Sequence, residues 1–382
     1  MLLAPPTLIL VWLMGLLSLG LLGGGAWLVW EWYDNWALNL PADRRLLVAG
    51  LLLLALPLLG RFMLTPFLGR RPRAGEQEMR QMPQGAVHRI VRPDGAVLHV
   101  QAYGPENAPV LLFTHGWGLS LAEWFYAHQH LVGRYRLLVW DLPGLGQSSP
   151  PQDHQYDLER LAGHLKAVLE LAGKQRVILC GHSIGGMITL TFCRLFPEAL
   201  LHQVAGLVLT HTTPTNPVQT AWGAPLLRRL QGPLLRPLCA VTIALSPLVR
   251  LMNLLAFLSG LSHLGNHLMQ FGGTETRGQL DFVVHHDLRA NPAVAARGML
   301  AMMRYDAVDV LPAISVPVLV VAANHDKQTL PAASDFITRN LPHAEEVMLA
   351  PGGHLGLLEQ HGEWLKAVEA FAERCLPREA RA

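Results

Sequence analysis

Residues 178–187, ILCGHSIGGM, contain the feature that decides how the chain folds. An apolar run typical of a buried strand ends at Gly181, and Ser183 follows two residues later. After Ser183, apolar residues recur at helical spacing as far as residue 199. This order predicts a strand, a sharp turn that contains Gly181, Ser183 and Gly185, and then a helix. That is the setting in which the pattern G-x-S-x-G is informative.

The predicted turn would place the Ser183 hydroxyl in an unusual position. Glycine is expected at 181 and 185 because a side chain at either position would clash with neighbouring backbone. The hydroxyl would then be held out at the carboxyl end of the strand, at the N-terminus of the next helix. A serine hydroxyl is a weak nucleophile at neutral pH and needs an adjacent base, so a histidine and a carboxylate are expected nearby.

Asp326 and His354 follow Ser183 in the chain order acid, then histidine. Asp326 ends the strand-like run VPVLVVAANHD, and His354 lies in LAPGGHLGLLEQH, after the apolar run 347–350. Loops at the carboxyl ends of strands are where open α/β sheets keep their sites. We predict that Ser183 attacks, that His354 takes and later returns the proton, and that Asp326 orients the imidazole.

Each of these assignments has an alternative. Asp326 is also placed to cap the helix expected over LPAASDFITRN, and His354 is also compatible with an ordinary loop position. Three further histidines lie near the same motifs and are rival bases: His182, His325 and His361. Chain order and spacing together favour Ser183, His354 and Asp326.

Acyl transfer also requires backbone N–H groups that stabilise an oxyanion. We expect one from Ile184, directly after the nucleophile. The second is expected from the turn HGWG at 115–118, where Gly116 allows the turn and Trp117 is the predicted donor. A rigid donor of this kind lowers the barrier by roughly 3–4 kcal/mol.

Apolar strand-like runs alternate with helical stretches over most of the chain. This alternation predicts an α/β fold with a doubly wound, mostly parallel sheet covered on both faces. The segment AVHRIVRPDGAVLHVQAYG, which starts at residue 86, indicates a β-hairpin. Residues 216–305 interrupt the alternation and are predicted to form an inserted helical cap. Residues 65–85, rich in proline, arginine and glycine, are predicted to be a linker.

Five features resemble those of the α/β-hydrolase superfamily, in its G-H-S-x-G serine esterase and lipase-like branch: HGWG, DLPGLGQS, GHSIGG, the strand ending at Asp326, and GGHLGLLE. The resemblance covers about residues 86–376 and implies the α/β-hydrolase fold. Ser183 argues against the haloalkane dehalogenase and epoxide hydrolase branches, which use an aspartate nucleophile. Ala323 stands where the family usually has glycine before the acid, and Asp141 matches a position with a structural role.

The N-terminal 64 residues predict a membrane anchor. The chain is 51% hydrophobic and only 15% charged, whereas about 25% of residues are charged in an ordinary soluble protein. Residues 8–30 are uncharged, and about 20 such residues cross a bilayer core. They lack the basic start and cleavage site of a signal peptide. A second apolar run, 46–60, also spans if it extends to residue 64. We predict two transmembrane helices over 1–64, at 8–30 and 46–64; an interfacial or re-entrant second segment is the alternative.

The arginines that flank the two apolar runs predict the orientation of the anchor. The loop 31–45 carries Arg44 and Arg45, whereas five arginines lie within residues 61–80: Arg61, Arg70, Arg71, Arg73 and Arg80. The larger count favours the cytoplasm for the N-terminus and for everything after residue 61, in a bacterial-type inner membrane. If the second run does not cross, the large domain lies on the opposite side.

Charge and cysteine usage argue against several classes of protein. The net charge of +2 gives no indication of nucleic-acid binding. The four cysteines show no CxxC spacing, which argues against a disulfide scaffold or a zinc site. The pairs His285–His286 and His263/His267 are candidate metal ligands, but polar surface or lid positions explain them better. We therefore expect no metal ion and no organic cofactor.

The cap has a distinctive composition. Residues 217–274 carry four arginines and no acidic residue among long apolar stretches. This suits a lid over the site and contact with an anionic membrane surface, with plain packing onto the body as the alternative. A third span over 241–261 is disfavoured because Pro247 and Arg250 would lie near its middle.

Together, these features predict a membrane-anchored serine hydrolase that cleaves carboxylic esters of hydrophobic, acyl lipid-like substrates. Two alternatives stay open. The same residues support hydrolysis of thioesters, amides or C–C bonds, and a membrane-tethered binding protein would need no catalysis. The sequence leaves the oligomeric state open.

Overall fold

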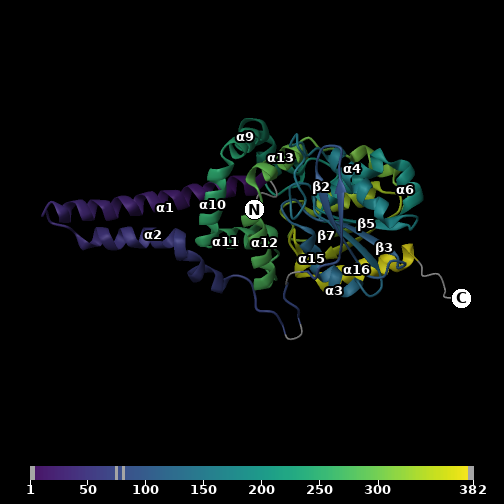
Figure 1. Ribbon diagram of the computed structural model, residues 1–382, viewed down its shortest axis with the longest axis horizontal. Helices are drawn as coiled ribbons and strands as arrows, with labels where there is room; N and C mark the ends of the chain where they lie inside the picture. The colour runs from purple at the N-terminus through teal and green to yellow at the C-terminus, as the bar shows by residue number, and fades with distance from the viewer. Residues whose placement is uncertain (1–4, 74–75, 80–81, 377–382) are drawn as a thin grey trace.

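The chain forms an eight-stranded sheet with helices on both faces, an inserted helical cap and a projecting N-terminal helical hairpin (Figure 1). The computed structural model describes residues 5–73, 76–79 and 82–376. Arg80, which contributes to the predicted orientation of the anchor, lies outside the described residues.

The sheet has the strand order β1-β2-β4-β3-β5-β6-β7-β8. The antiparallel hairpin of β1 and β2 pairs with β4 in the antiparallel sense, and all other neighbours are parallel. The strands are β1 Ala86–Val91, β2 Val97–Tyr103, β3 Val110–Thr114, β4 Arg136–Trp140, β5 Val177–His182, β6 Val204–Thr210, β7 Val318–Ala323 and β8 Ala344–Leu349. The predicted mostly parallel sheet and the hairpin that begins at residue 86 are confirmed.

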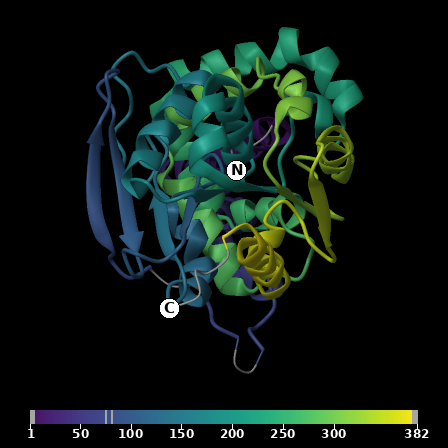
Figure 2. The ribbon, with the colours of Figure 1, turned by 90° about the vertical axis from the view of Figure 1, so that its right-hand side faces the viewer.

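The central strands are apolar throughout because both of their faces are covered (Figure 2). In β3, Val110 and Leu112 belong to one apolar core, whereas Leu111 and Phe113 belong to the other. The first core includes α4 Leu158–Leu169 and α5 Ile184–Leu195, and the second includes α3 Phe125–Leu131 and α16 His361–Cys375. The body also contains three further helices: α6 Pro197–Gln203, α14 Pro331–Asn340 and α15 Gly356–Glu359.

Apolar residues also recur at helical spacing over 120–132 and 155–173, which predicts two helices, and both are shorter than these ranges. The segment 120–132 begins as a 3-10 helix, Leu121–Trp124, and becomes α-helical only in α3. The segment 155–173 is α-helical only in α4, because a 3-10 turn follows and the chain reverses at Gly173, whose φ is +63°. Both differences lie at helix ends, where 3-10 turns are common.

The cap helices follow β6 and precede β7, as the interrupted alternation predicts. They are α7 Pro217–Thr220, α8 Ala224–Leu230, α9 Arg236–Ala244, α10 Ser246–Leu258, α11 Leu261–Gln270, α12 Arg277–Arg289 and α13 Pro292–Met302. The chain bends by 97° between α9 and α10. This bend, next to Pro247, means that residues 241–261 do not form one straight helix. That they do not span the membrane stays a prediction. The cap boundaries at 216–305 and the linker at 65–85 stay predictions.

The N-terminal hairpin consists of α1 Pro5–Ala37 and α2 Arg44–Leu64, which contact each other and project from the body (Figure 1). Within the described residues, these are two helices long and apolar enough to cross a membrane, at Thr7–Ala37 and Arg44–Phe67. Both extend beyond the predicted runs 8–30 and 46–64 because the polar residues at their ends are also helical.

Candidate active site

Ser183 occupies a strained turn between β5 and α5. Its φ is +53° and its ψ is −117°, outside the regions that L-residues normally adopt. A Cβ at Gly181 would lie 2.4 Å from the backbone of Gly185, and one at Gly185 would lie 2.2 Å from the carbonyl oxygen of Thr114. The tight packing explains why glycine stands on both sides of the turn.

Ser183, His354 and Asp326 form a continuous hydrogen-bonded chain. The Ser183 Oγ lies 3.0 Å from Nε2 of His354. The other ring nitrogen, Nδ1, lies 2.9 Å from Oδ2 and 3.1 Å from Oδ1 of Asp326. His354 and Asp326 are buried, with exposed fractions of 4% and 2%. An imidazole held in this way can accept the serine proton while the carboxylate stabilises its charged form.

The turn after β7 holds the carboxylate of Asp326. The backbone N–H groups of Gln328 and Thr329 donate to Oδ1, and the Thr329 hydroxyl donates to Oδ2. Burial favours the neutral acid, but the interaction with His354 and the hydrogen bond from Thr329 outweigh burial and lower the pKa of Asp326. The carboxyl is therefore ionised at neutral pH. Leu330, not Asp326, precedes the first residue of α14, so the helix-cap alternative for Asp326 is wrong.

Ala323 fits where the related pattern has glycine because the loop that carries His354 leaves room for its methyl group. A Cβ at Gly352 or at Gly356 would lie 3.4 or 3.3 Å from the Cβ of Ala323. Glycine on the opposite loop thus compensates for alanine on β7.

The two predicted oxyanion donors lie in the turn after β3 and at the start of α5. Ile184 is the first residue of α5, where backbone N–H groups lack acceptors within the helix. The N–H of Gly116 donates to Glu123 Oε2 at 2.8 Å, so the candidate donor in the HGWG turn is the next amide, that of Trp117. The Trp117 ring anchors the turn to the cap, because its Nε1 donates to the carbonyl oxygen of Ala295 in α13.

Two of the three rival histidines are engaged elsewhere, and the third is exposed. Nδ1 of His182 lies 2.5 Å from Oε1 of Glu123, and its Nε2 lies 3.0 Å from the carbonyl oxygen of His354. His361 stacks on Tyr126, with ring centroids 3.9 Å apart, and His325 is exposed. Only His354 has a ring nitrogen within hydrogen-bond distance of Ser183 Oγ in the described part of the chain.

Glu123 is a residue that the sequence reasoning did not identify. It is 1% exposed. Burial alone would raise the pKa of Glu123, but the charge of His182 outweighs burial, and the pKa of Glu123 is lowered. Burial alone would lower the pKa of His182, but the interaction with Glu123 outweighs burial, and the pKa of His182 is raised. The pair is therefore charged. A glutamate five residues after His-Gly-Trp-Gly is a weak signal by itself, because only the fold shows that it faces His182.

His211 and Glu359 are two further buried groups beside the site. His211 follows β6 with a φ of +44°, and its ring centroid lies 6.3 Å from that of His354. Burial lowers its pKa to about 3, so it is neutral. Glu359 accepts hydrogen bonds from the backbone N–H groups of Gly272, Thr274 and Gly353, and so joins the His354 loop to the cap.

The candidate metal ligands are also paired with protein groups. His263 contacts Asp281, and His267 contacts Glu275. The His286 Nε2 lies 2.8 Å from the Ser120 hydroxyl. Among the described residues, no group of three or more histidine, cysteine or acidic side chains is placed to hold a metal ion.

Comparisons with known proteins agree with this fold. Residues 109–234 match a family model described as alpha/beta hydrolase fold. A pimeloyl-[acyl-carrier protein] methyl ester esterase of Nitrosomonas europaea is 26% identical over 72% of this chain and 100% of its own length. Epoxide hydrolase 4 of Mus musculus is 29% identical over only 29% of this chain and 31% of its own length. A putative aryl esterase of Burkholderia cenocepacia has a similar structure, with a TM-score of 0.63 at 20% identity over 76% of this chain and 100% of its own.

Proposed function

The chain has the α/β-hydrolase fold, as its sequence motifs predict, and we propose that it is a membrane-anchored serine hydrolase that cleaves carboxylic esters of lipophilic acids. The observation that carries the proposal is the hydrogen-bonded chain from Ser183 through His354 to Asp326. The relatives are named as an esterase and an epoxide hydrolase, which supports a hydrolase activity for this chain. Serine stands at position 183, which favours an esterase over an epoxide hydrolase, whose branch uses aspartate there.

The reaction would proceed in two halves. In the first half, Ser183 Oγ attacks the ester carbonyl carbon while His354 Nε2 takes the hydroxyl proton. The oxyanion is stabilised by the N–H groups of Ile184 and Trp117. His354 then gives its proton to the departing alkoxide, and an alcohol leaves an acyl group on Ser183. In the second half, His354 takes a proton from water while the resulting hydroxide adds to the acyl carbon. The bond between that carbon and Ser183 Oγ then breaks, His354 returns its proton to Oγ, and the acid leaves.

The proposed membrane anchor is supported by the exposed surface of the hairpin. Large apolar side chains such as Leu13, Leu52 and Phe62 are more than half exposed there. Exposed aromatic rings gather towards the end of α1, as at a membrane–water interface: Trp27, Trp30, Tyr33 and Trp36. Because α1 and α2 run out from the body and back, two crossings would put the N-terminus and the hydrolase body on one side. We propose that this side is the cytoplasm.

A chain-length series of esters tests the proposed activity. Wild-type protein in phospholipid vesicles is expected to hydrolyse esters of long-chain acids faster than acetate or butyrate esters, and Ser183→Ala to hydrolyse none. A preference for two- or four-carbon acids would contradict the lipophilic substrate. Hydrolysis of only a thioester or amide series would favour those alternatives, and binding without any turnover would favour the non-catalytic one. Reporter fusions after residues 40 and 80 test the orientation.

A further inference from the structure

Helix α10 lies across the base of the hairpin and contacts both of its helices (Figure 1). Glycine stands at both contacts. A Cβ at Gly15 of α1 would lie 2.3 Å from Cε of Met252 in α10, and a Cβ at Gly60 of α2 would lie 2.8 Å from the carbonyl oxygen of Ser259, the residue directly after α10. Arg61 is also stacked over the ring of Phe257 at 4.9 Å. The cap and the anchor are therefore joined where the hairpin leaves the body.

The length of α1 indicates where the bilayer begins. Its 33 residues extend about 50 Å, whereas a bilayer core is about 30 Å thick. The excess lies within the body, where Leu8, Val11 and Met14 are buried and the Trp12 ring donates to the Thr242 hydroxyl of α9 at 2.9 Å. The part of α1 beyond Gly15 extends about 33 Å, enough to cross the core. Helix α10 is thus at the level where the hairpin would enter the bilayer.

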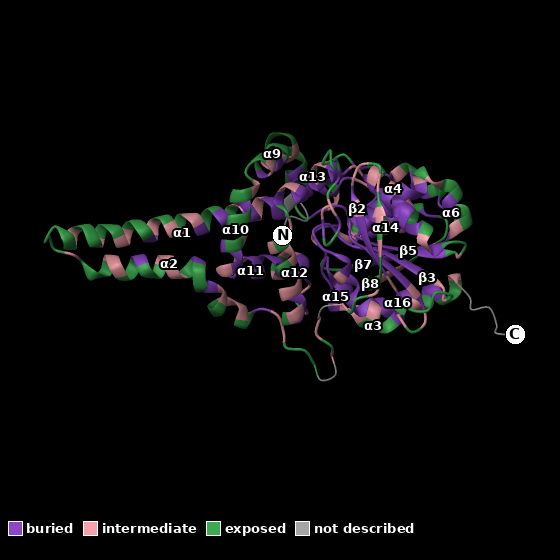
Figure 3. Cartoon of the chain, viewed as in Figure 1, coloured by how far each residue is buried: buried purple, intermediate pink, exposed green. Residues whose placement is uncertain are grey.

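One face of α10 is apolar and exposed. Leu248, Leu251 and Leu254 recur every three residues, with exposed fractions of 39%, 46% and 40%, and the opposite face is buried through Val249 and Met252. In Figure 3, exposed residues along α10 continue into those of the hairpin. Because α10 contacts both helices of the hairpin, its exposed apolar face lies close to the apolar surface that we propose enters the bilayer.

We propose that α10 is an interfacial helix, whose outer leucine row (Leu248, Leu251 and Leu254) lies in the headgroup and upper acyl region of a phospholipid bilayer. The proposal rests on the anchoring part of the proposed function and adds a second contact with the membrane. Four arginines within the otherwise acid-free residues 217–274 suit lipid phosphates: Arg228, Arg229, Arg236 and Arg250. This contact fixes the cap on the bilayer surface, so that the body does not swing freely on its anchor.

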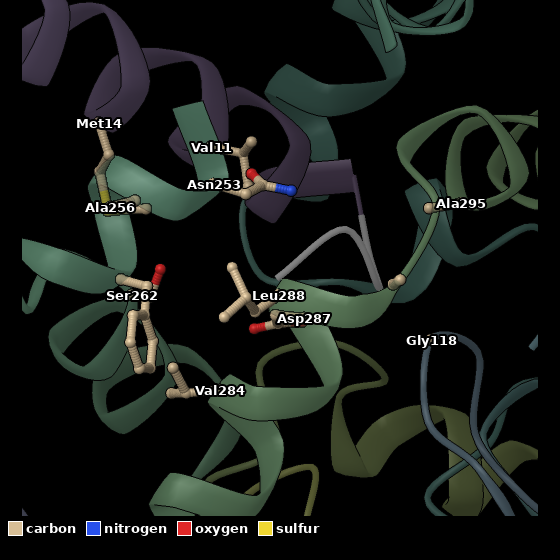
Figure 4. A pocket seen from close by; sticks show the side chains of 12 residues that line it. Val11, Met14, Gly118, Asn253, Ala256, Ser262, Val284, Asp287, Leu288 and Ala295 are labelled. Carbon is tan, nitrogen blue, oxygen red and sulfur yellow. The ribbon is translucent and has the colours of Figure 1, made fainter. Parts of the chain in front are cut away.

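The inner face of α10 lines a slot that reaches Gly118, in the turn of the predicted oxyanion donor. The slot lies behind α10, with Val11 and Met14 of α1 on one side, Ala256 of α10 and Leu288 of α12 on another, and Gly118, next to Trp117, in the wall (Figure 4). Its interior of about 20 Å³ holds roughly one water molecule. The slot is therefore too small for an acyl chain unless α10 and α1 move apart.

Fluorescent labels on single cysteines test the position of α10 in the full chain. Cys375, the one half-buried native cysteine, is replaced by serine, since Cys180, Cys193 and Cys239 are buried. A nitrobenzoxadiazole label is then attached in three separate variants: Leu251→Cys on α10, Leu52→Cys on the hairpin and Leu201→Cys on α6 of the body. Leu201 is 56% exposed and is the matched control. The proteins are placed in phosphatidylcholine vesicles with or without lipids that carry a nitroxide at carbon 5 or carbon 12 of the chain.

The label at 251 is expected to emit at shorter wavelength than the label at 201 and to be quenched at least twofold more strongly by the carbon-5 nitroxide. The label at 52 is expected to be quenched most by the carbon-12 nitroxide. If 52 is quenched but 251 behaves like 201, α10 is not interfacial, while the anchor stands. If 52 is not quenched, the anchor itself is wrong, and the inference that rests on it falls with it.

Discussion

His182 and Glu123 form a buried charged pair, with Nδ1 and Oε1 2.5 Å apart. The second oxygen of Glu123 accepts the N–H of Gly116 in the HGWG turn, and the second nitrogen of His182 contacts the carbonyl oxygen of His354. Two side chains thus join the turn of Ser183, the predicted oxyanion turn and the loop of His354, the proposed base. The contacts of the pair are with Gly116 and with the backbone of His354, so we expect the pair to position the proposed catalytic groups.

Glu123→Gln tests this positioning role. The substitution removes the charge that balances His182, and loss of one partner of a buried pair costs about 3–5 kcal/mol of stability. We expect kcat for a short-chain ester to fall by at least about tenfold, equivalent to about 1.4 kcal/mol of barrier, with KM nearly unchanged. The exposed Glu363→Gln is the matched control and should behave as wild type. If folded Glu123→Gln protein, checked by circular dichroism, keeps its kcat within twofold, the pair has no such role.

Asp326→Asn tests the acid of the site. Asparagine keeps the size of the side chain but no longer stabilises a charged His354, and the equivalent change in a serine protease triad lowers kcat by about 10⁴-fold. A loss of similar size is expected here, measured as kcat on a soluble ester. Asp335→Asn, on the exposed surface of α14, serves as control. A loss of less than tenfold would show that another group supplies the charge.

The buried neutral histidines predict a dependence of stability on pH. Burial lowers the pKa of His115 to about 4 and that of His211 to about 3, from an ordinary 6.5. Between pH 6.5 and about 4 the unfolded chain therefore binds protons that the native chain does not, and each histidine makes unfolding easier by up to about 1.4 kcal/mol per unit of falling pH. Asp141 has the opposite effect on stability below pH 6. Burial raises its pKa to about 6, so the native state binds a proton there that the unfolded chain does not, and falling pH stabilises the native state.

His211→Asn isolates one of these contributions, since asparagine tolerates a positive φ. Urea unfolding of wild type and variant in detergent, followed by tryptophan fluorescence, gives the free energy of unfolding at pH 5 and pH 7. We expect the loss of stability between pH 7 and pH 5 to be smaller in the variant. An equal loss in both proteins would mean that His211 takes up its proton in the native state.

Ala256→Trp tests the slot behind α10. Ala256 is 3% exposed and lines the slot, whereas Leu251 lies on the outer face of the same helix. A tryptophan at 256 is expected to lower kcat/KM for a sixteen-carbon ester at least tenfold more than for a butyrate ester, because only the long chain needs the slot. Leu251→Trp should leave that ratio within twofold of the wild-type ratio. Equal losses for both esters in the folded Ala256→Trp protein would place the acyl chain elsewhere.

Local patterns were sufficient to predict the sheet, the nucleophile turn and the order of the site residues. The glycines around Ser183 and the apolar strands carry their meaning within a few residues of sequence. The Glu123–His182 pair could not be predicted, because its partners are 59 positions apart and meet only when β3 and β5 lie side by side. Hydropathy likewise could not show that Leu8 and Val11 are buried in the cap, since a bilayer and a protein interior select the same side chains.

The central claim, that Ser183 is the nucleophile, is tested most directly by a fluorophosphonate probe. Membranes that hold the wild-type protein or Ser183→Ala are incubated with the probe, and labelling of the 382-residue chain is read by in-gel fluorescence. The wild-type chain is predicted to be labelled and Ser183→Ala to remain unlabelled. Equal labelling of both chains, or of neither, would contradict the account.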